Sequence, residues 1–363
     1  MANEGVRKKP AETSKIITQL SPWNSNQNII WLASTLALHR NIEKFKFPQK
    51  LDTERKKHIL SLVTKTLFDI KGLDHPFAVG AEELAPFEKN FLLEHFLIFE
   101  GFQEARTGEA FVLDDSGQFL ALLNLKDHIQ LRYTDVSGDL EGSWAKLVAV
   151  ENGLAPTCNF AFSQKFGFLT ADPAISGTGL IVTAYLHLPA LIHLNELQDF
   201  FEKEKNEAIL CTGIQGNPDE FIGDMLAVRN AYTIGVNEES IIGALRSAIL
   251  KFVIAEKHAR NRIKSEMTPI IKDKVSRALG TLQFSYQLDT VEALSTISAL
   301  KLGIELGWVT GVSVEEINRL FFTCRKAHLS SSLKEKIANE DEALKRAEYL
   351  REKTKAATAS IQR

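Results

Sequence analysis

The spacing of apolar residues along the chain changes at about Asn237. Before this point, stretches with apolar residues at every second position alternate with stretches of helical spacing. After it, apolar residues recur every three or four positions almost to the end. This pattern predicts an α+β domain over residues 21–236, followed by an all-α domain over 237–355. Residues 1–20 are polar and are expected to form a disordered leader, and 356–363 a short tail.

Several segments of the first domain have the pattern of strands. In the clearest of them Ile129, Leu131 and Tyr133 alternate with polar residues, so one face should be buried and the other should face a cleft or solvent. Two apolar runs that flank an Asp-Asp-Ser-Gly turn predict a hairpin. The predicted hairpin and strands cover residues 111–124, 128–133, 180–187, 208–214 and 232–236.

Helices are predicted from helical spacing and from capping signals. In the first domain they cover residues 28–39, 52–68, 140–154 and 191–205. In the second domain Asp289 with Glu292, and Ser313 with Glu316, are pairs typical of capping boxes at helix starts.

Composition narrows the class of protein. The 363 residues are 44% hydrophobic and 25% charged, with a formal net charge of −3, which favours neither nucleic acid nor an anionic membrane as partner. Cys158, Cys211 and Cys324 are odd in number and far apart, so we expect reduced thiols in the cytosol, without disulfides or a metal site. No apolar run has the length of a signal-peptide core at the start or of a membrane span elsewhere.

Three local features have both a chemical and a structural interpretation. The Ser-Gly-Thr-Gly stretch at 176–179 could cradle an anion, but it lacks P-loop spacing and is better explained as a connection. His187 lies among apolar residues and is better explained as a core histidine than as a ligand. Asp127 and His128 could form an acid/base pair, but neighbouring strand residues point to opposite faces.

Several stretches resemble one known family in their order and spacing. Phe-Leu-Thr-Ala-Asp-Pro at 168–173, Gly-Thr-Gly-Leu at 177–180 and His-Leu-Pro-Ala-Leu at 187–191 resemble the signature loop and following strand of the ATP:guanido phosphotransferases. The resemblance is strongest to the bacterial protein arginine kinases, which phosphorylate arginine side chains in proteins. It implies an antiparallel sheet flanked by helices, with a glutamine synthetase-like catalytic fold, and then a helical domain that forms a homodimer.

The resemblance also implies which positions should bind the nucleotide. In that family, arginines of an SxRxR stretch and three later arginines clamp the phosphates, because phosphoryl transfer needs positive charge around them. The five matching positions of this chain are all neutral: Thr35, Ala37, Gln130, Ile181 and Thr212.

The positions that should hold the substrate guanidinium also differ from the family. Lys126 replaces a carboxylate, Asn217 replaces a glutamate, and Asp172 replaces the loop cysteine beside the substrate. A carboxylate and a guanidinium about 4 Å apart gain roughly 4 kcal/mol at an effective dielectric constant of about 20, and Lys126 would turn this attraction into repulsion. Loss of one such stabilising group typically costs roughly 10²–10³ in rate.

Three basic residues remain near these positions: Arg40 and His128 persist from the family pattern, and Arg132 lies two residues past Gln130 on the same strand face. Arg40, His128 and Arg132 could still reach an anion in a reorganised pocket, and structural retention is the alternative for each. In the helical domain, the kinases carry a phosphoarginine pocket marked by an RDxxRA motif. The matching stretch is Glu-Ala-Leu-Lys-Arg-Ala at 342–347, where an acidic residue replaces the leading arginine and should repel a phosphate.

These departures predict a catalytically inactive homologue, without bound ATP or magnesium, that acts as a scaffold or regulator. The partners implied by the resemblance belong to a bacterial stress and proteolysis pathway: a zinc-binding adaptor, a repressor, or the AAA+ chaperone of a protease. One alternative is an ATP- and Mg-dependent protein-arginine phosphotransferase with weak or altered activity. Another is a module that binds some other small ligand in the vacated cleft.

Overall fold

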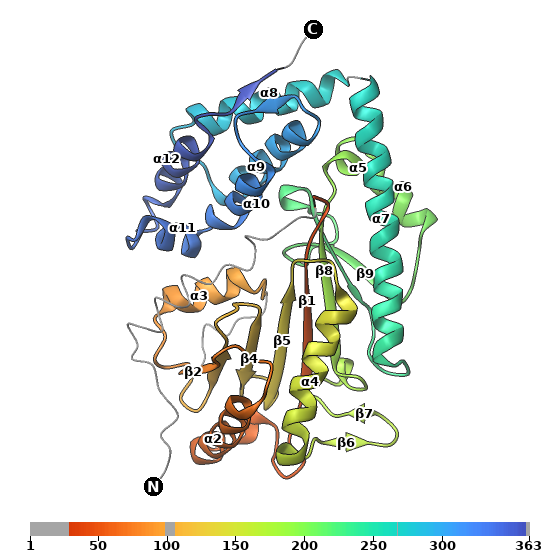
Figure 1. Cartoon of the computed structure of the whole chain (residues 1–363), viewed down its shortest axis with the longest axis vertical. Coiled ribbons are helices and arrows are strands. Elements are labelled where there is room, and N and C mark those ends of the chain that lie inside the picture. Colours follow the sequence, from red (N-terminus) through yellow and green to blue (C-terminus); the bar gives the residue numbers. More distant parts are fainter. Residues whose placement is uncertain (1–28, 99–105, 267, 361–363) are drawn as a thin grey trace. The chain divides into compact units, whose positions relative to one another are not determined.

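The computed structural model describes residues 29–98, 106–266 and 268–360 (Figure 1). The predicted leader at 1–20 and the last three residues of the predicted tail lie outside the described residues. Contacts divide the chain into two compact units that interleave in sequence. The first contains residues 33–183 and 229–246, and the second contains 29–32, 184–228 and 247–360. The domain boundaries expected from the sequence stay predictions.

Eight strands form one sheet in the order β2-β3-β4-β5-β1-β8-β10-β9 (Figure 1). The pairs from β2 to β1 are all antiparallel, which confirms the predicted fold class. The strands are β1 (Trp31–Arg40), β2 (Phe77–Gly80), β3 (Ala110–Leu113), β4 (Phe119–Leu123), β5 (Ile129–Asp135), β8 (Leu180–His187), β9 (Ile209–Gly213) and β10 (Met225–Asn230). Two short antiparallel ribbons pair β6 (Phe162–Ser163) with β7 (Gly167–Phe168), and β11 (Val309–Thr310) with β12 (Thr358–Ala359).

The helices of the first unit are α2 (Thr53–Asp69), α3 (Pro86–His95) and α4 (Leu140–Cys158), together with the start of α7 (Glu238–Glu266). The second unit holds the rest of α7 and the helices α5 (Pro189–His193), α6 (Leu197–Lys203), α8 (Pro269–Phe284), α9 (Thr290–Glu305), α10 (Val314–Thr323), α11 (Lys326–Leu333) and α12 (Glu342–Thr354). Short 3₁₀ turns are η2 (Pro48–Lys50), η3 (Pro173–Ile175) and η4 (Ile222–Asp224).

In the first unit, α2 and α4 pack together, and α4 packs on β5. Ile129 and Leu131 are buried, and the Tyr133 hydroxyl accepts a hydrogen bond from Lys146 Nζ of α4 at 2.8 Å. The alternation predicted for this strand is therefore confirmed, with the apolar face under α4. The hairpin of β3 and β4 and the helix α2, which Asp52 caps, are confirmed as well.

The helix predicted at 28–39 is wrong, because residues 31–40 form the strand β1. All ten residues of β1 are buried, so apolar residues occur on both faces of the strand. A short, fully buried apolar run has no period that separates a strand from a helix. Its place in the interior of the sheet, between β5 and β8, decides the conformation.

Two further predictions need correction. The strand predicted at 232–236 is wrong: β10 ends at Asn230, whose side chain accepts from Val182 N and donates to Leu180 O, and so replaces the next backbone pairing with β8. The helix predicted at 191–205 divides into α5 and α6 at Asn195, which has a left-handed φ of 58°.

In the second unit the predicted helix starts at Asp289 and Ser313 are confirmed. Ser313 and Glu316 cap each other's backbone amides at the start of α10, and Asp289 Oδ1 accepts from Glu292 N at 2.8 Å. The expectation of helices alone is wrong in one place, where β11 and β12 form a ribbon.

No helix within the described residues has both the length and the apolar character that crossing a membrane would require.

Candidate functional site

The pairing of β1 with β5 brings four of the sequence-predicted site residues onto one face of the sheet. Ala37 lies opposite Arg132, and His39 lies opposite Gln130. Residues directly opposite each other in an antiparallel pair share a face, as do residues two positions apart in a strand. Thr35, Ala37, Gln130 and Arg132 therefore share the face turned away from α4, and we call these four residues the vacated face.

The vacated face is neutral except at one residue. Thr35 and Ala37 are buried, and Gln130 is half-buried. Arg132 is half-buried, and its guanidinium donates to Phe96 O at 3.3 Å. The neighbouring strand β4 continues this face with Leu120 and Leu122 opposite Arg132 and Gln130. The side chains on these strands therefore favour apolar packing over a polyanion.

Ile181 and Thr212 lie on other strands. Ile181 is a half-buried residue of β8, and Thr212 is a half-buried residue of β9. Asn217 follows β9 in an exposed loop, where its side-chain oxygen accepts from Asp219 N at 3.0 Å. Ile181 and Thr212 are thus uncharged strand residues, and Asn217 stabilises its own turn.

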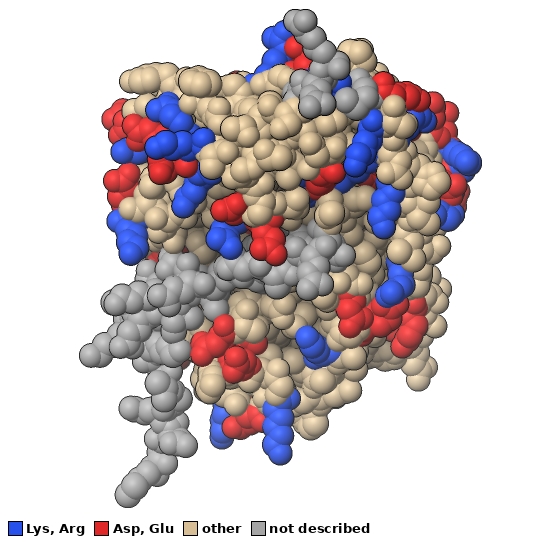
Figure 2. Space-filling model, turned by 45° about the horizontal axis from the view of Figure 1, so that its top comes forward, with Lys and Arg blue, Asp and Glu red and all other residues tan. Residues whose placement is uncertain are grey.

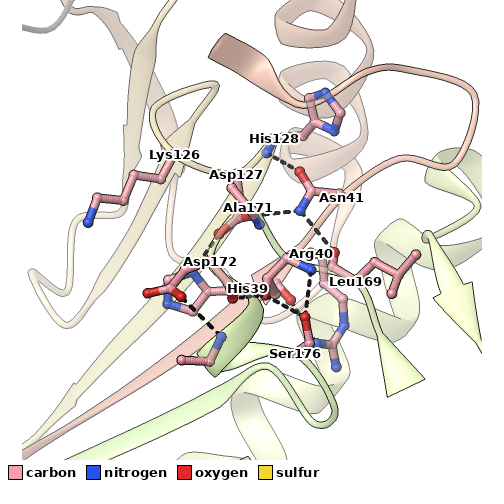
Figure 3. Close-up of polar contacts among 12 residues, drawn as sticks. His39, Arg40, Asn41, Lys126, Asp127, His128, Leu169, Ala171, Asp172 and Ser176 are labelled. Atoms are coloured by element: carbon pink, nitrogen blue, oxygen red, sulfur yellow. Dashed lines mark hydrogen bonds and ion pairs between the residues drawn. The ribbon is translucent and has the colours of Figure 1, made fainter. Parts of the chain in front are cut away.

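Asp127 is the centre of a buried polar cluster (Figure 3). Its carboxylate accepts hydrogen bonds from His39 Nδ1 at 2.9 Å, Asn41 Nδ2 at 2.6 Å and Ala171 N at 2.7 Å. Burial alone would raise the pKa of Asp127, but the hydrogen bonds and the charge of His39 outweigh it and lower that pKa. The cluster therefore holds an ionised carboxylate where the signature loop meets β1.

Sequence reasoning missed His39. This residue is 88 positions from Asp127 in the chain, and the polar parity of β1 was hidden by the helix that we predicted there. Only the position of β1 beside β5 brings the imidazole to the carboxylate. A strand prediction for 31–40 would have placed His39 on the same face as Thr35 and Ala37.

His128 contacts different groups from Asp127. Its Nδ1 accepts from Ile42 N at 3.0 Å, and its Nε2 lies 2.9 Å from Lys46 O. This arrangement requires the neutral ring with the proton on Nε2, and burial lowers the pKa of His128. Both ring nitrogens are therefore engaged by the backbone of the segment that follows β1.

Arg40 is fully buried and points away from the vacated face. Its Nε donates to Glu151 at 2.5 Å, and its Nη1 donates to His39 O and Thr178 O, both at 2.8 Å. The guanidinium lies 3.5 Å from the ring centre of Phe168. Burial lowers the pKa of Arg40, and Glu151 offsets part of this effect. These contacts join β1, α4 and the signature loop.

Two exposed residues flank the Asp127 cluster. Figure 3 shows the Lys126 side chain directed away from the cluster, and the residue is exposed. Asp172 is also exposed, and its carboxylate caps η3 by accepting from Ala174 N at 3.0 Å. Neither side chain contributes to the buried network of Asp127.

Backbone amides of the Gly-rich loop at 176–179 donate hydrogen bonds to carbonyl groups of neighbouring segments. Gly177 N donates to Phe168 O at 3.1 Å, and Thr178 N donates to Thr233 O at 3.0 Å. A Cβ atom at Gly177 would lie 2.3 Å from Thr233 O. Because these amides are already used, the geometry supports the structural interpretation of this loop over an anion cradle.

His187 and the RDxxRA-like stretch are structural in the second unit. His187 Nε2 lies 2.7 Å from Ser298 Oγ, its Nδ1 lies 3.3 Å from Arg260, and burial lowers its pKa well below the usual value. Arg346 is fully buried, where it donates to Cys324 O and Leu288 O and pairs with Glu342. The retained arginine of that stretch thus fixes backbone carbonyls.

Charge is distributed evenly on the surface that can be seen. On the face drawn in Figure 2, the described basic and acidic side chains are interspersed. Within the described residues, no group of three or more His, Cys, Asp and Glu side chains is arranged to hold a metal ion.

Comparison with known proteins gives consistent matches. The family described as "ATP:guanido phosphotransferase, C-terminal catalytic domain" matches residues 58–259, and "Protein-arginine kinase McsB C-terminal domain" matches 269–363. A protein from Chlamydia pneumoniae named "Protein-arginine kinase" is 34% identical over 306 residues, which cover 84% of each chain. A protein of the same name from Halothermothrix orenii is 30% identical over 338 residues, covering 92% of this chain and 96% of that one.

Solved structures show the same fold at lower identity. The crystal structure of lombricine kinase has a TM-score of 0.56 and 17% identity, and the match covers 66% of this chain and 70% of that chain. The duplicated taurocyamine kinase from Schistosoma mansoni, solved with transition-state analogue components, has a TM-score of 0.55 and 21% identity, covering 62% of this chain and 33% of that chain.

Proposed function

The chain belongs to the ATP:guanido phosphotransferase family, and we propose that it is a catalytically inactive member that acts as a scaffold or regulator. The observation that carries this proposal is the vacated face, where Thr35, Ala37 and Gln130 lie together at positions that the family resemblance assigns to phosphate-binding arginines. A family member that cannot hold a triphosphate still offers its folded surface to other proteins.

The loss of charge is large in energetic terms. Each unit charge placed about 4 Å from a phosphate oxygen is worth roughly 4 kcal/mol at an effective dielectric constant of about 20. The positions of Thr35, Ala37, Gln130, Ile181 and Thr212 supply none of this. Arg132 is the one cation of the vacated face, and a single cation replaces only part of a five-arginine clamp. ATP and magnesium therefore do not fit the residues present, and we assign no phosphoryl-transfer step.

The remaining charged residues support the same proposal. Arg40 is held by Glu151 and two carbonyls, and His128 by two backbone groups. Moving either side chain to a nucleotide would leave buried polar groups without partners, at a cost of about 1–3 kcal/mol for each group. Their retention is explained by the fold without a role in nucleotide binding.

The proposed partners follow from the family resemblance. They are a zinc-binding adaptor, a repressor, or the AAA+ chaperone of a protease, met in the cytosol of a bacterium. We also propose that the helical residues after 237 form a homodimer.

A second candidate is a protein-arginine phosphotransferase with weak or altered activity. The names of the curated relatives favour it, since proteins 34% and 30% identical to this chain are called protein-arginine kinases. The ionised Asp127 beside His39, together with Arg132, would be the residues available to such an activity.

A third candidate, a module that binds another small ligand at the vacated face, needs no catalysis.

Mass spectrometry for phosphoarginine separates these candidates. The full chain is incubated with Mg·ATP and a mixed protein substrate, with the Halothermothrix orenii relative as a parallel sample. An inactive protein gives no phosphoarginine above the level of a sample without protein. Time-dependent phosphoarginine that disappears in an Arg132→Gln variant would establish the second candidate.

A further inference from the structure

A cavity of about 400 Å³ lies in the second compact unit, lined by α6, β9 and α7. Three phenylalanines form much of its wall: the ring centre of Phe252 is 4.7 Å from that of Phe200 and 6.0 Å from that of Phe201. Ile209 and Cys211 of β9 complete the apolar part. Cavities that hold small organic ligands typically have volumes of roughly 300–1,000 Å³.

This cavity is separate from the positions that the family uses. Ile209 and Cys211 line it, and they alternate along β9 with Thr212, the position of a family arginine. Because neighbouring residues of a strand point to opposite faces, the cavity lies on the other side of β9 from Thr212. Thr212 is therefore not part of the wall of this cavity.

The mouth of the cavity carries an excess of negative charge. Its charged residues are three carboxylates and two ammonium groups: Glu204, Glu207, Asp219, Lys205 and Lys251. Lys251 Nζ donates to Glu204 at 2.7 Å, so these two charges offset each other. Within the part of the chain that the structure describes, Glu207, Asp219 and Lys205 form no ion pair, so these three groups leave a net charge of −1. An apolar wall below such a mouth favours a ligand with an apolar body and a positive charge.

We propose that this cavity binds a small organic cation with an aromatic or branched apolar body, such as an arylalkylamine. The apolar body packs against Phe200, Phe201 and Phe252, and the amine lies at the mouth near Glu207 and Asp219. Aromatic rings attract cations through their electron-rich faces, so the wall and the mouth favour the same ligand class. This binding site goes beyond the proposed function and does not depend on it.

Cys211 provides a reporter inside the cavity. Its thiol is half-buried on the wall, whereas Cys158 and Cys324 are fully buried. Burial raises the pKa of the Cys211 thiol to about 12, so alkylation is slow but confined to one site of the folded protein. A ligand in the cavity should slow this reaction further by covering the sulfur atom.

The test measures alkylation of Cys211 by a small maleimide at low salt in the full chain, followed by peptide mass spectrometry. The probes are tryptamine, a cation, and indole-3-acetate, an anion with the same ring. We expect tryptamine at about 10 mM or below to slow alkylation several-fold. Indole-3-acetate should bind roughly fivefold more weakly, because its negative charge is repelled by the carboxylates at the mouth. No protection by tryptamine, or equal protection by both probes, would overturn the proposal.

Two matched variants test the role of the mouth. In Glu207→Gln/Asp219→Asn the preference for tryptamine over indole-3-acetate should disappear, while both probes still bind the apolar wall. Glu202→Gln changes an exposed residue of α6 that does not line the cavity and should keep the preference. All these side chains are exposed, so the variants are expected to fold. An unchanged preference in the double variant would contradict the assignment of the amine to this mouth.

Discussion

His39 Nδ1 lies 2.9 Å from Oδ2 of Asp127, and this contact joins β1 to the loop that precedes β5. The same carboxylate holds Asn41 and the backbone of Ala171, so it fixes the signature loop against the sheet. Asp127 is the centre of a buried hydrogen-bond network. The contact explains how this part of the family fold is held together.

Replacement of Asp127 should therefore destabilise the protein. We expect Asp127→Ala to lower the free energy of unfolding by about 3 kcal/mol, because three buried donors lose their acceptor. Asp172→Ala, which removes an exposed carboxylate only a few residues from the same cluster, should cost less than about 1 kcal/mol. Urea unfolding of the two variants measures the difference. Equal small losses would show that the Asp127 network does not support the fold.

Arg40 should behave as a structural residue. Arg40→Lys keeps the charge but loses the forked contacts with Glu151 and the two carbonyls, so we expect a loss of about 2–4 kcal/mol in unfolding free energy. Arg246→Lys, in an exposed ion pair with Glu141, should cost less than about 1 kcal/mol. Thermal and urea unfolding compare the two. If Arg40→Lys leaves the free energy of unfolding unchanged, Arg40 is not needed for the fold, and a role in anion binding becomes the better explanation.

Stability should fall in mild acid because two histidines are held neutral. Burial lowers the pKa of His128 and His187, so the unfolded chain binds more protons than the native protein below about pH 6.5. The free energy of unfolding should thus decrease as the pH falls from about 6.5, by up to roughly 1.4 kcal/mol per pH unit for each histidine.

Two carboxyl groups act in the opposite direction over part of this range. Burial raises the pKa of Asp114 and Glu305, so each releases its proton at higher pH in the native protein than in the unfolded chain. Comparison of a histidine variant with the unchanged protein cancels the contribution of these two carboxyl groups, because both proteins contain them. His187→Gln should flatten the pH dependence of urea unfolding below about pH 6.5 relative to the unchanged protein. An identical slope in both proteins would show that His187 is not held neutral.

The Gly-rich loop should tolerate no side chain at Gly177. Its φ is +101°, and an added Cβ would lie 2.3 Å from Thr233 O, so Gly177→Ala should cost at least about 2–3 kcal/mol. Gly216 has a similar φ of +84° but no atom within 4 Å of an added Cβ, so Gly216→Ala should cost only about 1–2 kcal/mol. Equal losses measured by thermal unfolding would exclude close packing of the loop as the cause.

Local signals in the sequence were sufficient for part of this structure. Ser313 and Glu316 cap α10 as predicted, because a capping box involves four consecutive residues. The strand β5 and its buried face followed from alternation alone. By contrast, β1 has apolar residues on both faces, and its conformation depends on its neighbours β5 and β8 in the sheet.

The candidate site could be predicted only in part for the same reason. The resemblance locates Thr35 and Gln130, and the sequence indicates Asp127 only as a possible acid/base partner of His128. The contact of Asp127 with His39, and that of Arg40 with Glu151, 111 positions away, depend on strand register and helix packing. Motif matching therefore predicts which positions depart from the family, and the structure shows the contacts of the residues that stand there.

Calorimetric titration of the full chain with Mg·ATP tests the central claim most directly. A vacated face with neutral residues at the clamp positions should give no binding heat at nucleotide concentrations up to about 1 mM, whereas the Halothermothrix orenii relative is the positive control. A saturable isotherm with a dissociation constant below about 100 µM, lost in Arg132→Gln, would contradict the account.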